Sequence, residues 1–271
     1  MSRVAEGDVA ALLVVLGQSH AVASAALGPH SLSWSSVFDL QGSTPRAELP
    51  PVDGPVVDDQ HIEDEGTLRW ASTEDSPGWA LSQANNHERG RDVIALGERM
   101  FVRMRHRGWV AQPYDDAAVA LWLDDAQQTV HDAVEFAAPR LAVEKQVVAG
   151  QGIAGGEAWV LTLSLAPADV ALDAERPSAK SVRRTWRENT KLTKVSGKVT
   201  VDGTTGIWLA ADLNVQYGLV GADRRKMVGS LSLKAEVKVG PPEPIRAPSD
   251  LVELPTRRRY VDERQALLEG L

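Results

Sequence analysis

The sequence contains no cysteine, and this absence removes several classes of chemistry. Disulfides, thiolate metal centres and cysteine nucleophiles are all excluded. Long hydrophobic runs are missing too, because no stretch reaches the roughly 18 unbroken apolar residues that a membrane-spanning helix needs. Positive charge is not in excess: the formal net charge is -8 and the pI is about 5.3. We therefore expect no general nucleic-acid binding, which requires a basic face.

Aromatic residues are scarce at 5%, but their distribution is biased. Eight are tryptophans, against three tyrosines and three phenylalanines, which favours wide apolar surfaces with a polar edge. With 43% hydrophobic and 24% charged residues, the composition is that of a globular protein. A β-rich chain of 271 residues commonly forms one folding unit. We predict a single domain over residues 1–271.

Motifs for catalysis and metal binding are also missing. Neither HExxH nor GxSxG occurs. Residues 150–156 have the GxGxxG spacing, but a strand pattern follows them where a dinucleotide site needs a helix, so we predict a glycine-rich hairpin. His61 precedes Glu63, Asp64 and Glu65, a set suited either to a cation or to a solvated acidic loop, and we favour the loop. The sequence thus predicts no catalytic residue, no metal, no cofactor and no enzyme activity.

Helical periodicity marks the beginning of the chain. Apolar residues at helical spacing predict a first helix over 8–27. The stretch Ala10–Leu16 followed by 23–25 imitates a signal peptide, but Glu6 and Asp8 stand where such a signal is positively charged. We therefore favour an amphipathic helix.

Two further helices are predicted later in the chain. A 3.6-residue period runs over 115–138, between Asp115 at its N-terminal end and Pro139 after its last turn. This segment is predicted to be a helix that acts as a lid. A short terminal helix is predicted over 261–270.

Alternation of apolar and polar residues predicts about ten strands, most clearly within 194–201, 209–217 and 231–239. Their short connections favour antiparallel neighbours. Residues 43–65, rich in proline and acidic side chains, are predicted to form an acidic loop insertion. A two-sheet sandwich and one wrapped sheet both fit the alternation, but so few helices among so many strands favour an α+β fold. We predict a single strongly curved antiparallel sheet, a half-barrel, covered by helices on its concave face.

Several short motifs follow one another in a characteristic order. They are Leu40-Gln41-Gly42, Gly66-Thr67-Leu68-Arg69-Trp70, Gly78-Trp79-Ala80-Leu81, the run from Asp92 to Val102, and Val201-Asp202-Gly203-Thr204-Thr205-Gly206 before Trp208-Leu209. In this order, over nearly the whole chain, the sequence resembles the LolA/LppX/LprG superfamily of lipoprotein and lipid carriers. The resemblance implies a half-barrel covered by helices, a cavity for a lipid or acyl chain, no chemistry, and a location in the periplasm or at the outer membrane.

The resemblance and the apolar stripes together predict a hydrophobic ligand between the concave face and the long helix. The predicted lining residues are Trp70, Trp79, Leu81, Ile94, Leu96, Val102, Met104, Val119, Trp122, Leu123, Ala126, Leu161, Leu163, Leu213 and Val215. A second hypothesis is a non-transporting envelope lipoprotein that fills its own core and binds an envelope protein partner. Peripheral or lipid-anchored membrane association and the oligomeric state stay open under both hypotheses.

Overall fold

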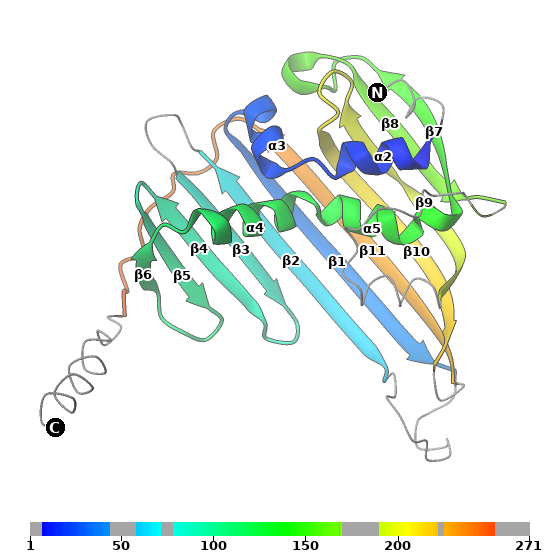
Figure 1. Cartoon of the computed structure of the whole chain (residues 1–271), viewed down its shortest axis with the longest axis horizontal. Helices are drawn as coiled ribbons and strands as arrows, with labels where there is room; N and C mark the ends of the chain where they lie inside the picture. Colours follow the sequence, from blue (N-terminus) through cyan, green and yellow to red (C-terminus); the bar gives the residue numbers. More distant parts are fainter. Residues whose placement is uncertain are drawn as a thin grey trace, which may run out of the picture.

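The computed structural model describes residues 7–43, 58–71, 78–167, 169, 190–221 and 225–252. In these residues eleven strands form one open antiparallel sheet with the order β6-β5-β4-β3-β2-β1-β11-β10-β9-β8-β7 (Figure 1). The strands are β1 (His30–Gly42), β2 (Gln60–Trp70), β3 (Gly78–Asn85), β4 (Gly90–Leu96), β5 (Arg99–Met104), β6 (Val110–Pro113), β7 (Leu141–Val148), β8 (Ala158–Leu165), β9 (Thr190–Asp202), β10 (Trp208–Val220) and β11 (Lys226–Val239).

Two meanders make up this sheet. Strands β1 to β6 step outward to one edge, and β7 to β11 step inward from the other, so that the first and last strands pair at the centre. The register of that central pair runs from His30 opposite Val239 to Gly42 opposite Met227. The prediction of one antiparallel sheet is confirmed, with eleven strands instead of about ten.

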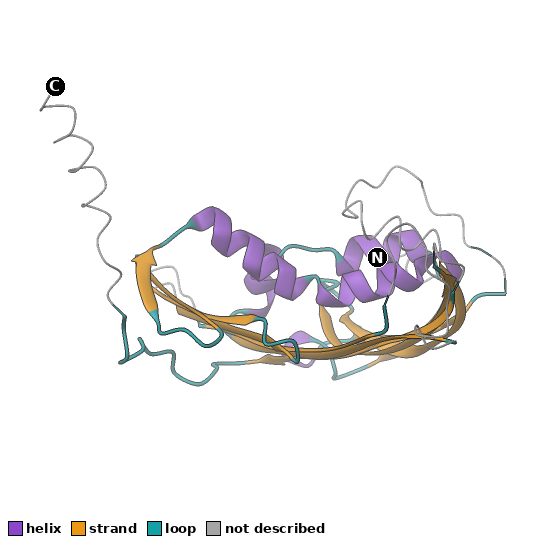
Figure 2. Cartoon of the chain, turned by 90° about the horizontal axis from the view of Figure 1, so that it is seen from below, coloured by secondary structure: helices purple, strands orange, loops and turns teal. Residues whose placement is uncertain are grey.

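Among the described residues, four helices lie on one side of the sheet, which curves toward them at both ends (Figure 2). They are α2 (Val9–Leu16), α3 (His20–Leu27), α4 (Asp116–Gln127) and α5 (Thr129–Ala137); short 3₁₀ turns cover Ala138–Arg140 and Ile153–Gly155. Most of the buried apolar residues form a single cluster that includes residues of these helices and of the sheet. The α+β architecture follows from this covering of one face.

The predicted first helix, 8–27, is two helices bent by 75°. The backbone N–H of Gly17 donates to Leu13 O at the end of α2, and the Ser19 hydroxyl accepts from Val22 N at the start of α3. These caps end one helix and begin the next within three residues. No single helix in the described ranges has the length and apolarity needed to span a membrane, although α2 and α3 taken together do.

The predicted lid helix, 115–138, is likewise divided, into α4 and α5. Asp115 caps α4 as expected, accepting from Ala117 N and Ala118 N. The division has a visible cause at the last residue of α4: the indole Nε1 of buried Trp208 donates to Gln127 O over 2.9 Å. A carbonyl engaged from outside the helix marks a local break in the helical ladder.

The predicted loop over 43–65 requires a correction, because β2 begins at Gln60. Residues 60–65 pair with β1, with Ile62 opposite Phe38 and Asp64 opposite Ser36. Glu63, Asp64 and Glu65 are thus consecutive residues of a strand, and their side chains alternate between its two faces. Residues 44–57 lie outside the described residues, as does the predicted helix over 261–270.

The glycine-rich segment 150–156 connects β7 to β8, which confirms the hairpin prediction. Its partner is Asp202, the last residue of β9. The Asp202 carboxylate accepts hydrogen bonds from Ile153 N at 2.8 Å, Thr204 N at 3.1 Å, and Thr205 N and Oγ1 at 2.7 and 2.8 Å. Burial opposes ionisation, but these hydrogen bonds outweigh it and lower the pKa of Asp202. One carboxylate thus ties two neighbouring hairpins together.

Two buried histidines lie where α3 meets the sheet. His20 of α3 and His30 of β1 are 2% and 0% exposed, with ring centroids 5.6 Å apart. His30 Nδ1 pairs with Gly28 O at 2.8 Å, and His20 contacts the Trp70 ring edge-on. Within the described part of the chain, neither Nε2 atom has a hydrogen-bond partner. Burial lowers the pKa of both rings, that of His20 to about 3 with a contribution from His30.

Acidification is therefore expected to destabilise the fold through His20. In the unfolded state His20 binds a proton near pH 6.5, and in the folded state only near pH 3. The stability that depends on the neutral, buried ring is therefore fully present above pH 6.5 and is lost as the pH falls toward 3. At about pH 5 the loss from His20 alone is about 2 kcal/mol in the free energy of unfolding. His20→Phe, which cannot ionise, is expected to reduce the difference between urea denaturation curves at about pH 7.5 and pH 5.

The matched control is His87→Gln, because His87 is exposed. This variant is expected to keep the pH dependence of the wild type. Equal losses of stability in the wild type and in His20→Phe would contradict the assignment to His20.

Candidate functional site

A cavity of about 880 Å³ lies between the sheet and the two helices α4 and α5. Its lining comes from β1 to β5 and β11 on one side, and from residues 125–136 on the other. We call it the lid cavity. Two kinds of side chain line it, and they occupy different parts of the sheet.

The apolar part of the lid cavity is formed at the centre of the sheet. Phe38 of β1 stands opposite Ile62 of β2 and Leu231 of β11, so these three side chains make one row across three strands. Phe136 of α5 also lines the cavity, and its ring meets Tyr217 edge-on at 5.1 Å. Sheet and helix therefore offer apolar surface to the same space.

Two glycines let aromatic rings lie flat on this face. A Cβ at Gly66 would stand 2.0 Å from Cζ2 of Trp34, and a Cβ at Gly229 would stand 2.2 Å from Cζ of Tyr217. Both rings therefore extend sideways over the backbone of a neighbouring strand. In this position the two rings project less far from the sheet, and Trp34 forms part of the cavity wall.

The polar part of the lid cavity lies over β2 to β5. Gln83, Arg91 and Met104 are consecutive partners across β3, β4 and β5. The Nε of Arg91 donates to Gln83 Oε1 at 2.8 Å, and its guanidinium lies 5.0 Å from the centre of the Trp122 ring. Burial lowers the pKa of Arg91, while nearby Asp125 acts in the opposite direction. The half-buried guanidinium of Arg91 thus already interacts with the side chains of Gln83, Trp122 and Asp125.

Most residues predicted from sequence to line a ligand site lie in the packed core. The buried ones are Trp79, Leu81, Val119, Leu123, Ala126, Leu161, Leu163, Leu213 and Val215. Trp70, Val102 and Trp122 are partly buried and pack against the same cluster. Met104, 52% exposed, is the one of the fifteen that lines the lid cavity.

The remaining two, Ile94 and Leu96, require a correction. Val93 and Ala95 of the same strand belong to the core cluster, so Ile94 and Leu96 point to the opposite face of the sheet. Strand β4 carries apolar residues on both faces. Its own alternation therefore does not identify the buried face, which is set by pairing with Leu81 of β3.

Sequence reasoning missed most of the cavity lining. The alternation over 34–40 was a signal, since Trp34, Ser36 and Phe38 line the lid cavity. Adjacent acidic residues in a helical pattern are typical of caps and solvated positions. That holds for Asp115, whereas Asp125 lines the cavity.

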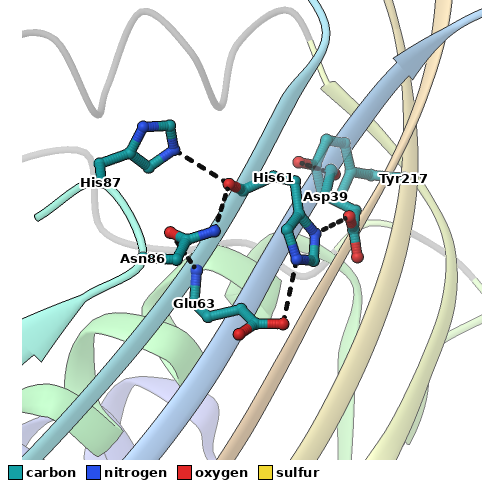
Figure 3. A network of polar contacts seen from close by, with 6 residues as sticks. All are labelled: Asp39, His61, Glu63, Asn86, His87 and Tyr217. Atoms are coloured by element: carbon teal, nitrogen blue, oxygen red, sulfur yellow. Dashed lines mark hydrogen bonds and ion pairs between the residues drawn. The ribbon is translucent and has the colours of Figure 1, made fainter.

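A polar network occupies the other face of the sheet, around His61 (Figure 3). His61 Nδ1 lies 2.6 Å from Asp39 Oδ1, and Nε2 lies 3.0 Å from Glu63 Oε1. Asn86 of the β3–β4 turn donates to His61 O and accepts from Glu63 N, while His87 Nε2 lies 3.0 Å from the same His61 carbonyl. The Tyr217 hydroxyl of β10 donates to Asp39 O at 3.4 Å, so the network joins a turn to three strands. None of its six residues is a serine, threonine or cysteine nucleophile.

This arrangement divides the acidic group that the sequence placed together. Residues of one strand alternate between faces, so His61, Glu63 and Glu65 share a face while Asp64 points to the other and lines the lid cavity. The alternative of a cation held by all four residues is therefore not supported by their geometry.

The nearest approach to a metal-ligand set in the described part of the chain is on α5. Ligand atoms of His131, Asp132 and Glu135 all lie within 4.8 Å of one another, and the three side chains are partly buried. His131 Nδ1 is 3.3 Å from Asp132 Oδ1, an ion pair when the ring is protonated. Asp132 and Glu135 also line the lid cavity.

The pKa of His61 offers a direct test of the network. Hydrogen bonds from the ring to Asp39 and then Glu63 raise the pKa of His61. The stabilisation that comes from this charged ring is present below pH 6.5 and is lost as the pH rises through the raised pKa, which is opposite in sign to His20. Asp39→Asn is expected to lower the pKa of His61, followed by NMR titration of the ring.

The control for this measurement is Glu65→Gln. It removes a negative charge from the same face of β2 without removing a hydrogen bond to the ring. We expect a much smaller change in the titration midpoint. A midpoint that does not move in Asp39→Asn would show that the 2.6 Å contact does not form in solution.

No protein-family model matches the sequence, and no curated protein matches it. Among solved structures, the chain is similar to a DUF1329 family protein from Desulfovibrio piger ATCC 29098. The two share 8% sequence identity with a TM-score of 0.22, over 86% of this chain and 90% of that one.

Proposed function

We propose that this chain binds an amphipathic ligand with an apolar tail, such as a lipid or acyl chain, in the lid cavity. The observation that carries the proposal is the two-sided lining of a space of about 880 Å³. Small-molecule sites commonly occupy roughly 300–1,000 Å³ and combine apolar walls with a few polar groups. Each buried methylene of a tail contributes about 0.8 kcal/mol, so the apolar row and Phe136 would supply affinity.

Binding without chemistry is the form of activity we infer. The described lining of the lid cavity contains no histidine, and of its two hydroxyl groups, on Ser36 and Thr129, that of Thr129 donates to Asp125 O. Activation of a hydroxyl nucleophile ordinarily needs a base such as histidine within hydrogen-bond reach. An envelope carrier of lipid or lipoprotein, in the periplasm or at the outer membrane, is the biological role that fits the sequence resemblance.

A second candidate function is favoured by one observation. Nine of the fifteen predicted lining residues are packed in the core, so much of the space beneath the helices is filled by the protein itself. A chain of this kind would serve as an envelope interaction module that binds a protein partner. The two proposals differ in whether the lid cavity takes up a ligand.

A bulky side chain placed in the lid cavity distinguishes the carrier proposal from the interaction-module proposal. Ser36 lines the lid cavity, whereas its neighbour Ser35 points to the other face and is exposed. Ser36→Trp is expected to weaken binding of the neutral apolar dye N-phenyl-1-naphthylamine by about tenfold or more, about 1.4 kcal/mol, because the indole occupies the site. Dye fluorescence reports the affinity, and thermal denaturation confirms that the variant is folded.

Ser35→Trp is the matched control, since it adds the same side chain to the same strand outside the cavity. It is expected to bind the dye like the wild type. A wild-type protein that does not bind the dye at all would contradict the carrier proposal and leave the interaction module.

Native mass spectrometry gives an independent check. The protein purified without detergent is expected to carry an adduct of lipid size that disappears after organic extraction. A clean apo mass before extraction, together with no dye binding, would remove the support for a carried ligand.

A further inference from the structure

Two buried ring nitrogens lie without partners where α3 meets β1. His20 and His30 are 2% and 0% exposed, and no hydrogen bond from the described residues reaches the Nε2 atom of either ring. Polar atoms that are buried without a partner are costly, and in folded proteins they ordinarily meet a water or an ion. Neither histidine lines the lid cavity, so the pair is a separate place in the fold.

One contact fixes the protonation state of His30. Its Nδ1 lies 2.8 Å from Gly28 O, and a carbonyl oxygen can only accept, so Nδ1 carries the ring hydrogen. Burial lowers the pKa of His30, which keeps the ring neutral near pH 7. Its Nε2 is therefore a buried lone pair. Metal-binding histidines have this arrangement, in which the second ring nitrogen donates to a carbonyl or carboxylate.

His20 brings a second neutral imidazole to the same place. Burial lowers the pKa of His20 to about 3, so protons do not compete for its lone pair near pH 7. The two ring centroids are 5.6 Å apart. Two imidazoles that share one ion through metal–nitrogen bonds of about 2 Å hold their ring centres about 6 Å apart, which is close to the separation of this pair.

The described residues offer these two rings no third ligand. The one group of three potential ligands among them is on α5 and includes neither histidine. Asp124 Oδ1 accepts from the backbone N–H of His20 and is thus engaged away from the rings. Two imidazoles alone suit an ion that prefers linear two-fold coordination, as Cu⁺ does, whereas Zn²⁺ prefers four ligands. A single charge is also less costly to bury than a double charge.

We propose that His20 and His30 form a buried site for a soft monovalent cation of the Cu⁺ class, which takes one nitrogen from each ring. The ion would join the first turn of α3 to the first residue of β1, beside the point where Asp124 ties α3 to α4. Because the ion binds the folded chain only, it would stabilise the attachment of the helices to the sheet. This site goes beyond the proposed function and does not depend on it.

Ag⁺ is the probe, because it has the charge and the linear coordination of Cu⁺ and needs no reductant. The chain has no cysteine, so no thiolate competes for the ion. In nitrate buffer without chloride, calorimetry of the full chain is expected to show uptake of one Ag⁺. At an Ag⁺ concentration about one hundred times the Kd, we expect the midpoint of thermal unfolding to rise by about 5–10 °C.

Variants assign the effect to the two rings. His20→Phe and His30→Phe each remove one ligand, and each is expected to lose both the uptake and the rise in midpoint. The midpoint of each variant without Ag⁺ is its own reference, so a change in stability is not mistaken for a loss of binding. His87→Gln removes an exposed imidazole and is expected to respond to Ag⁺ like the wild type.

NMR of the wild type tests the site without any substitution. Long-range ¹H–¹⁵N spectra of the histidine rings are expected to show two imidazoles with Nε2 signals that shift together and couple to the silver nucleus at one equivalent. Changes confined to other histidines would overturn the proposal. So would a wild type that takes up no Ag⁺, which would leave the two Nε2 atoms to water, or an undiminished rise in either phenylalanine variant.

Zn²⁺ tests the preference for a single charge, and it is expected to cause no rise that depends on His20 and His30. A Zn²⁺-induced rise that both phenylalanine variants abolish would overturn that preference. Binding of N-phenyl-1-naphthylamine, measured on the same samples, reports the proposed function separately, because neither histidine lines the lid cavity.

Discussion

The pairing of β1 with β11 is the constraint on which the rest of the structure depends. These strands come from opposite ends of the described chain, and their long antiparallel register joins the two meanders into one sheet. It also places Phe38 and Leu231 side by side in the apolar row of the lid cavity. Without this pair each meander would expose a long edge, and the floor of the cavity would be divided.

Local patterns in the sequence anticipate much of the fold but not its centre. Alternation identifies strands and short turns identify antiparallel neighbours, because both signals lie within a few residues of each other. The pairing of His30 with Val239 is separated by most of the chain, and no local pattern encodes it. The cavity floor depends on that pairing, which is why the alternation over 34–40 predicts a strand but not the cavity wall that Trp34 and Phe38 form.

The same contrast between local patterns and long-range contacts applies to the helices. Apolar periodicity runs through 115–138 without interruption, and nothing in it marks Gln127 as the end of a helix. At this break the indole of Trp208 donates a hydrogen bond to the Gln127 carbonyl. Trp208 lies more than eighty positions away in the sequence. Likewise, the alternation in β4 allows two faces, and only its register with β3 selects Val93 as the buried residue.

The attachment of the helices explains why core and cavity lie at different places along β1. Asp124 Oδ1 accepts from His20 N at 2.8 Å, so α4 is tied to α3 close to the buried His20–His30 pair, while Trp208 holds the end of α4. Near the start of β1 the helices pack tightly, and Leu32 is 1% exposed within the core. Farther along the same strand, Ser36 and Phe38 line the lid cavity, where Phe38 is only partly buried against the core. The lid is therefore fixed at one end of the strands and leaves a cavity toward the other, and this offset allows one sheet to serve both as the support of a rigid core and as the wall of a binding site.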